Sequence, residues 1–288
     1  MDAIVTAGGI PQPNDPLYTY TKGESKALLD IAGKPMIQWV LDALGDARNV
    51  DNVIITGLSP KSRVTCKKPI YFISNQGRML ANIVTGVEKS LELNKKNKYV
   101  LIVSSDIPAL TGRQVDWLIT TSLETEDDLY YGVCPREVME ARYPESKRTY
   151  TKIKDMQVCG SDINIAHVRM AEPDYLEMWE KLIGNRKSPI AQAALIGLDT
   201  FFQVLTRSVT LDELVRKASG RLHINGRAIV WQEAEPCMDV DKPHQFEMMR
   251  ADMERRARKP TDSKPAPRKK SPSRSKPAPK PAGKSKRK

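Results

Sequence analysis

The sequence predicts an α/β protein with a mainly parallel sheet flanked by helices. Three apolar runs, each flanked by amphipathic stretches, support this prediction: VIITG at 53–57, IYFIS at 70–74 and YVLIVSSD at 99–106. Alternation of this kind is typical of parallel sheets, because two parallel strands need a long crossover connection that is usually a helix. We therefore expect the strands to end at one edge of the sheet, where ligands of such folds bind.

The remaining elements follow from local patterns. A first strand is expected over 2–7, and the continuous apolar run over 99–105 predicts a strand buried on both faces. A helix over 79–93 has apolar residues along one face, namely Leu80, Ile83, Val84, Val87 and Leu91. Further helices are expected over 172–183, 188–196 and 211–219.

Composition divides the chain into a body, residues 1–254, and a tail, residues 255–288. The tail has 15 basic residues, one acidic residue and seven of the 20 prolines, whereas the body has 31 basic and 34 acidic residues. Without large apolar side chains the tail cannot form a core, so we expect it to be disordered. Its charge favours non-specific contact with nucleic acid or other polyanions, or a solubilising role.

The whole chain has 288 residues and 40% hydrophobic content. The body is therefore large enough to bury the core of one main domain. No apolar run approaches the roughly 18 residues of a transmembrane helix, and no basic segment followed by an apolar stretch opens the chain. We therefore expect a cytoplasmic protein without a transmembrane segment.

A glycine pair ends the first predicted strand. Ile4 and Val5 are followed by Ala7, Gly8 and Gly9. Two residues without a Cβ let backbone N–H groups approach an anionic ligand closely, as a nucleoside triphosphate would require. A plain tight turn explains the same pair equally well.

Carboxylates follow the buried strand and precede the last predicted helix. Asp106 lies after Ser104 and Ser105 and before a proline, a position that suits a divalent cation. The alternative is that Asp106 caps a helix starting near Thr111. Asp239 and Asp241 alternate in an extended segment, so both side chains project to one side and can share a metal, or one of them can cap the next helix.

Four segments in this order resemble the MobA-like nucleotidyltransferase superfamily: TAGG at 6–9, KALLDIAGKPMIQWVLDAL at 26–44, SSDIPALT at 104–111 and DVDKPHQFE at 239–247. This group includes molybdenum-cofactor guanylyltransferases, sugar-1-phosphate nucleotidyltransferases and cytidylyltransferases. The resemblance implies a Rossmann-like fold of the nucleotide-diphospho-sugar transferase type. It also implies transfer of NMP from an NTP to a phosphorylated small molecule, with release of pyrophosphate.

The resemblance carries site residues onto this chain. It implies that Mg²⁺ binds to Asp106, with Asp241 as the first choice and Asp239 as the second choice for a further ligand. Lys26 and Asp106 are the implied catalytic residues. Nucleotide binding is implied for the following residues: Ala7, Gly8, Gly9, Lys26, Asn75, Gln76 and Gly77.

For the acceptor, the segment 147–168 resembles the family's second binding region and implies Gly160, Asn164 and Asp162 as contacts. Lys152 or Arg148 is expected to meet the acceptor phosphate. The alternative is an exposed hairpin with its turn at 160–162. The helices predicted after residue 172 exceed what the smallest guanylyltransferases need, which favours a sugar or polyol phosphate acceptor.

One departure from the family pattern concerns the first loop. Members often have Gly-x-Gly-x-Arg there, whereas Ile10 to Asn14 contain no arginine and none precedes Lys26. Lys22 is a candidate for the missing positive charge. Two other classes stay open: a metal-dependent glycosyltransferase, whose Asp-x-Asp pair belongs after the central strand, and a non-catalytic nucleotide sensor with a polyanion-binding tail.

Overall fold

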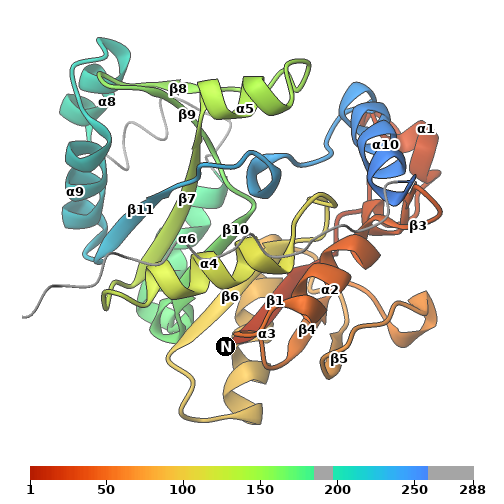
Figure 1. The fold of residues 1–288 in the computed structure, drawn as a ribbon. Helices are drawn as coiled ribbons and strands as arrows, with labels where there is room; N and C mark the ends of the chain where they lie inside the picture. The colour runs from red at the N-terminus through yellow and green to blue at the C-terminus, as the bar shows by residue number, and fades with distance from the viewer. Residues whose placement is uncertain (185–196, 259–288) are drawn as a thin grey trace, which may run out of the picture.

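The computed structural model describes residues 1–184 and 197–258, which form one large mixed sheet with helices on both faces (Figure 1). The sheet order is β5-β4-β1-β6-β10-β7-β9-β8, and β11 pairs with β7. The strands are β1 (Asp2–Thr6), β4 (Val53–Thr56), β5 (Ile70–Ile73), β6 (Tyr99–Ser104), β7 (Leu129–Pro135), β8 (Thr151–Lys152), β9 (Gln157–Gly160), β10 (Ile163–His167) and β11 (Gly226–Val230). A separate hairpin joins β2 (Asp30–Ile31) and β3 (Lys34–Pro35).

The helices alternate with these strands, as predicted. They are α1 (Tyr18–Thr21), α2 (Met36–Asp46), α3 (Met79–Leu93), α4 (Gly112–Ser122), α5 (Arg136–Arg142), α6 (Pro173–Gly184), α8 (Leu198–Leu205), α9 (Leu211–Leu222) and α10 (Pro243–Arg258). Short 3₁₀ turns are η1 (Lys26–Leu28), η2 (Pro60–Ser62), η3 (Val168–Ala171) and η4 (Glu235–Cys237). The helix expected over 188–196 lies outside the described residues. None of the helices in the described part is long and apolar enough to cross a membrane.

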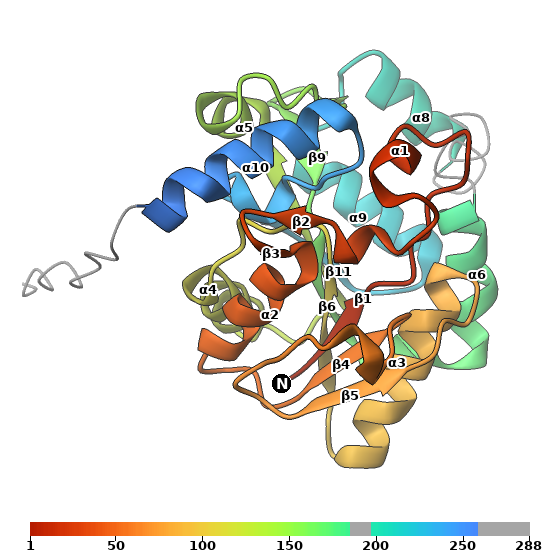
Figure 2. The same cartoon turned by 90° about the vertical axis from the view of Figure 1, so that its right-hand side faces the viewer.

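The two faces of the sheet build different cores, because successive strand residues point to opposite sides. On β1, Ala3 and Val5 join the main core with α2 and α4, whereas Ile4 joins a smaller core that α3 covers. β6 alternates in the same way. Figures 1 and 2 show α2 and α4 on one face, and α3 and α6 side by side on the other.

Parallel and antiparallel strands meet at the centre of the sheet. β1, β4, β5 and β6 are parallel, as the predicted βαβ alternation requires, but β10 runs antiparallel between β6 and β7. The hairpin alternative for 147–168 is wrong at residues 160–162, because β9 and β10 both pair with β7 and not with each other. The strand ends of β1 and β6 and the start of β10 therefore lie together.

The last helix runs further than the predicted end of the body. α10 extends to Arg258, so residues 255–258 are helical and not part of a disordered tail. Ion pairs of Arg256 with Glu235 at 3.0 Å and with Asp252 at 3.2 Å stabilise this last turn. Residues 259–288 lie outside the described part of the chain.

Two chain reversals meet behind the glycine pair. Gly57 follows β4 with φ +103°, and a Cβ placed on it would lie 2.3 Å from the Gly8 Cα. Only glycine fits there, because a side chain is strained at this φ and would overlap the backbone. Gly57 therefore fixes how closely the loop after β1 approaches β4.

We predict that Gly57→Ala lowers the free energy of unfolding by at least about 3 kcal/mol, because backbone strain of about 1 to 3 kcal/mol adds to the overlap with Gly8. Gly33→Ala is the matched control, since Gly33 has φ +88° but open space around its Cα. Urea unfolding of both variants gives the comparison. Equal losses in the two variants would contradict the role of close packing at Gly57.

Candidate functional site

A polar cleft of about 390 Å³ lies at the carboxyl ends of β1 and β6. The described residues that line it include Thr6, Gly8, Gly9, Lys26, Ala27, Asn75, Gly77, Arg78, Met79, Asn82, Ser104, Ser105, Asp106, Asp162, Asp239 and Asp241. The sheet brings these residues together from six separate parts of the sequence. The cleft thus joins the glycine pair to all three predicted metal ligands.

Gly8 gives the first wall of the cleft. A Cβ on Gly8 would lie 2.8 Å from the Asn75 side-chain oxygen and 2.9 Å from the Asn82 amide nitrogen. The Asn75 amide donates to the Gly8 carbonyl at 3.0 Å, and Asn82 donates to Asn75 at 3.1 Å. Gly9, in contrast, has open space where its Cβ would be. Gly8 is required by packing, while Gly9 keeps the backbone accessible from the cleft.

Lys26 is held in the cleft by its backbone and by its charge. Its N–H donates to the Gly9 carbonyl at 3.0 Å, at the start of η1. Its ammonium lies 2.5 Å from Asp106 Oδ2 and 2.6 Å from Asp241 Oδ1. Burial opposes the charged form, but the two carboxylates outweigh it and raise the pKa of Lys26 above its ordinary value. Lys26 is therefore a permanent cation in the site.

Asp106 projects into the cleft from the turn after β6. Its carboxylate accepts a hydrogen bond of 2.5 Å from the Ser104 hydroxyl, and its backbone carbonyl accepts from Val240 N–H at 3.0 Å. The alternative that Asp106 caps α4 is wrong, because Thr111 and Gln114 form the capping box of that helix. The Asp106 carboxylate therefore points into the cleft, and its backbone is hydrogen-bonded to the segment that contains Asp239 and Asp241.

The three aspartates form a cluster suited to a hard cation. One carboxylate oxygen from each of Asp106, Asp239 and Asp241 lies within 4.8 Å of the other two. Asp106 and Asp239 are buried, whereas Asp241 is more exposed. Carboxylate oxygens are the ligands that Mg²⁺ prefers, and the single Lys26 ammonium, which pairs with two members of the cluster, leaves it with a net negative charge. The donor set therefore fits a divalent cation.

Arg148 and Asp162 border this cluster. The Arg148 guanidinium forms an ion pair with Asp239 and donates to the Gly160 carbonyl at 3.2 Å. It lies 3.6 Å from Asp162 Oδ2, beyond hydrogen-bond distance. Burial and the nearby Asp106 charge raise the pKa of Asp162 to about 7. Arg148 is thus occupied by protein groups, while Asp162 faces the cleft.

The residues predicted for the acceptor are placed differently from one another. Asn164 lines a second cavity next to the cleft, and Gly160 lies beneath the Tyr131 hydroxyl. Lys152 lines a different cavity with Arg136 and Glu140, because β8 is the far edge strand of the sheet. The position of Lys152 does not support its predicted contact with the acceptor phosphate.

Other cleft residues carried weaker signals in the sequence. Gln76 is absent from the described lining, but its N–H donates to Asn82 at 2.8 Å and so shapes the turn before α3. Asn82 was not among the predicted site residues. The sequence signal for it is that a polar side chain lies close to the apolar residues of the helix 79–93. Arg78 lines the cleft and forms an ion pair with Glu180 of α6 at 3.1 Å, while Lys22 is exposed at the end of α1 and is absent from the described lining. The position of Lys22 therefore does not support it as the missing positive charge.

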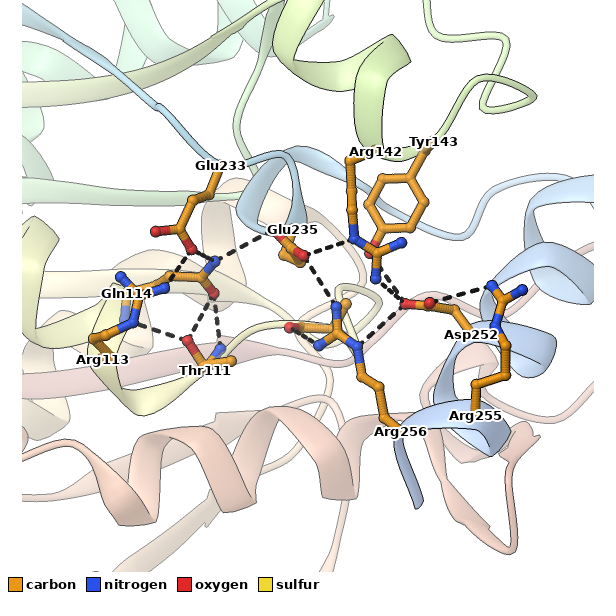
Figure 3. A network of polar contacts seen from close by, with 11 residues as sticks. Thr111, Arg113, Gln114, Arg142, Tyr143, Glu233, Glu235, Asp252, Arg255 and Arg256 are labelled. Atoms are coloured by element: carbon orange, nitrogen blue, oxygen red, sulfur yellow. Dashed lines mark hydrogen bonds and ion pairs between the residues drawn. The ribbon is translucent and has the colours of Figure 1, made fainter. Parts of the chain in front are cut away.

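A polar network anchors the segment that leads to Asp239 and Asp241 (Figure 3). Glu235 in η4 accepts from Arg142 of α5 and from Arg256 of α10, each at 3.0 Å. Arg142 also donates to the buried Asp252 at 2.6 Å. The Gln114 amide of α4 lies 3.4 Å from Glu235. These contacts hold Glu235, at the start of the segment 235–243, against α5 and α10.

Comparison with known proteins agrees with this geometry. The sequence profile described as MobA-like NTP transferase domain matches residues 4–191. The chain belongs to this family, whose members are nucleotidyltransferases, and it is therefore an enzyme of the NTP-transferring class. No curated protein matches the chain in sequence.

Solved structures give the same fold. A hypothetical transferase from Thermus thermophilus is similar with a TM-score of 0.72 and 29% identity, covering 85% of this chain and 98% of that one. A CMP:2-keto-3-deoxy-manno-octonic acid synthetase, solved with CTP, is similar with a TM-score of 0.54 and 16% identity, covering 88% of this chain and 98% of that one. A 4-diphosphocytidyl-2C-methyl-D-erythritol synthase from Anaerococcus prevotii is similar with a TM-score of 0.52 and 10% identity, covering 88% of this chain and 95% of that one.

We predict that Asp252→Asn destabilises the protein by about 2 to 4 kcal/mol, because it removes the buried acid that pairs with Arg142 and Arg256. Glu247→Gln on the same helix is the control: its ion pair with Arg250 is exposed and contributes less than about 1 kcal/mol. Urea unfolding compares the two. Similar losses in both variants would mean that the network does not anchor α10.

We predict that Asp162 makes stability depend on pH near neutrality. Its folded pKa of about 7 exceeds the ordinary value of 3.8, so its contribution is full below about pH 4 and is lost as the pH rises through 7. Relative to the wild type, Asp162→Asn should therefore become more stable by about 3 kcal/mol between pH 5 and pH 8, measured in EDTA. A stability difference from the wild type that is constant with pH would contradict this environment.

Proposed function

We propose that this protein transfers NMP from an NTP to a phosphorylated small molecule and releases pyrophosphate in a Mg²⁺-dependent reaction. The observation that carries the proposal is the meeting of Lys26 with Asp106 and Asp241 beside Gly8 and Gly9. The lysine and the accessible backbone N–H groups can bind phosphate oxygens, and the carboxylates can bind a divalent cation. Together these groups can bring two phosphates close enough to react. The family membership supports the NTP as donor.

The glycine pair and Lys26 are proposed to hold the triphosphate. Gly9 leaves backbone N–H groups accessible to phosphate oxygens. Lys26, released from Asp106 and Asp241 when the nucleotide binds, would move its ammonium to the departing pyrophosphate. Arg78, which lines the same cleft and pairs with Glu180, would supply a second positive charge. Asn75 and Gly77 are proposed to contact the nucleoside.

The carboxylates are proposed to hold Mg²⁺. Asp106 would be the central ligand, with Asp241 as first choice and Asp239 as second, because Asp239 is paired with Arg148. The bound cation would supply charge neutralisation between the α-phosphate and the incoming phosphate. When the Lys26 ammonium moves onto the phosphates, Mg²⁺ would take its place beside Asp106 and Asp241. No side chain is needed as a nucleophile, because the acceptor phosphate is ionised at neutral pH.

We predict that the full chain releases pyrophosphate from at least one of ATP, GTP, CTP and UTP when Mg²⁺ and phosphorylated small molecules are supplied together. Asp106→Asn should lower kcat at least 100-fold through loss of electrostatic stabilisation, in a variant that is still folded at the assay temperature, as circular dichroism can check. Asp116→Asn is the control, since Asp116 accepts hydrogen bonds from Arg48 and Asn49 N–H far from the cleft. Nucleotide binding without turnover across the panel would favour the sensor alternative.

The basic tail is proposed to contact nucleic acid or other polyanions non-specifically. We predict that deleting residues 259–288, which keeps α10 complete, weakens binding to a polyanion such as heparin and reduces its salt dependence. Pyrophosphate release should not change. Binding assays at 50 and 200 mM salt provide the measurement, and equal affinity of the truncated protein would place the binding surface in the body.

A further inference from the structure

We propose that the acceptor has an apolar body attached to its phosphate, and that this body binds in a cavity between α3, α6 and the sheet. The inference rests on the proposed function, because it assigns the acceptor half of the same reaction. It narrows the acceptor to a class, the phosphate esters of apolar alcohols. This class differs from the sugar or polyol phosphates that the sequence favoured.

The cavity adjoins the catalytic cleft. It has a volume of about 370 Å³ and shares four lining residues with the cleft: Thr6, Met79, Ser104 and Asp162. Two of these, Thr6 and Ser104, lie at the carboxyl ends of β1 and β6. A molecule whose phosphate lies beside Asp106 can therefore extend into the cavity.

Most of the cavity wall is apolar. Its described apolar residues are Met79, Leu80, Ile83, Val84 and Val87 of α3, Ile102, Leu129 and Ala166 of the strands, and Met170, Ala171 and Trp179 beyond them. The described lining includes no lysine and no arginine. A phosphate group would therefore be stable only at the end where the cavity meets the cleft, close to Lys26 and to the proposed Mg²⁺.

Three polar side chains in the wall, those of Asn164, Ser161 and His167, already have partners within the protein, whereas the buried Asp162 Oδ2, where the cavity meets the cleft, has no hydrogen-bond partner. The Asn164 side chain accepts from Gly132 N–H at 2.9 Å and donates to the Ser161 carbonyl at 3.2 Å. The Ser161 hydroxyl contacts the Ile163 carbonyl at 3.0 Å, and His167 Nδ1 accepts from Arg169 N–H at 3.1 Å. A polyol placed here would lose water from several hydroxyls and gain few hydrogen bonds, whereas an apolar group gains from burial.

Strand alternation explains why this space is open. On β10, Ile163 and Ile165 point into the main core, so Asn164 and Ala166 point to the opposite face. α3 covers β1 and β4 there, and α6 is anchored by a hydrogen bond of 3.1 Å from the Trp179 indole to the Met170 carbonyl. Small Ala166 leaves room between these two helices over β6, β10 and β7.

The test compares acceptors that share a phosphate and differ in their body. Pyrophosphate release by the full chain is measured with each NTP, Mg²⁺ and either 3-methylbutyl phosphate and benzyl phosphate or glycerol 3-phosphate and glucose 1-phosphate. We expect kcat/KM to be at least about 100-fold higher for the apolar esters. Equal or higher values for the polyol phosphates would overturn the inference and leave the proposed function standing.

A paired variant tests the location of the apolar body. Ala166→Leu fills the cavity and should lower the ratio of kcat/KM for 3-methylbutyl phosphate over glycerol 3-phosphate at least tenfold. Ala81→Leu on α3 is the control, because Ala81 does not line the cavity, and it should keep the wild-type ratio. An unchanged ratio in Ala166→Leu would place the apolar body elsewhere and contradict the inference.

Direct binding separates this inference from the proposed function. Calorimetry with 3-methylbutyl phosphate should show binding to the wild type that weakens at least tenfold in Ala166→Leu. If no pyrophosphate is released from any NTP with any of the acceptors but this binding pattern holds, the transfer reaction is refuted and the apolar site is supported. If 3-methylbutyl phosphate does not bind at all, the inference is refuted whatever the turnover.

Discussion

The structure depends on one charge arrangement: the Lys26 ammonium held between Asp106 and Asp241. Burying carboxylates together costs free energy unless a cation neutralises them. Lys26 supplies that cation and links the loop after β1 to the turn after β6 and to the segment before α10. The network around Glu235 and Asp252 ties η4, α5 and α10 together beside that segment.

The same arrangement explains how a metal and a nucleotide can enter together. Lys26 and a divalent cation compete for the same two carboxylates, and a triphosphate offers Lys26 a new anionic partner. Nucleotide and cation binding are therefore expected to support each other. The adjoining cavity is proposed to add selectivity, because its described walls are largely apolar and the side chains of Asn164 and His167 already have partners within the protein.

Local patterns in the sequence predicted much of the fold. The helix over 79–93 and the strands at 53, 70 and 99 agree with the structure, because the periodicity of apolar residues records which face is buried. The insertion of β10 between β6 and β7 could not be predicted in this way, since strand order is set by contacts between distant segments. The same limit applies to Lys152, whose distance from the cleft follows from β8 being an edge strand, and to Asn82, whose role depends on Gly8 and Asn75.

The most direct test of the account is a crystal structure of the full chain with Mn²⁺ and a non-hydrolysable NTP analogue, with the metal located by its anomalous scattering. The account predicts a peak coordinated by Asp106 and by Asp241 or Asp239, with the Lys26 ammonium moved onto the phosphates. A nucleotide bound elsewhere, or in the cleft while Lys26 stays between Asp106 and Asp241 and no metal contacts Asp106, would contradict it.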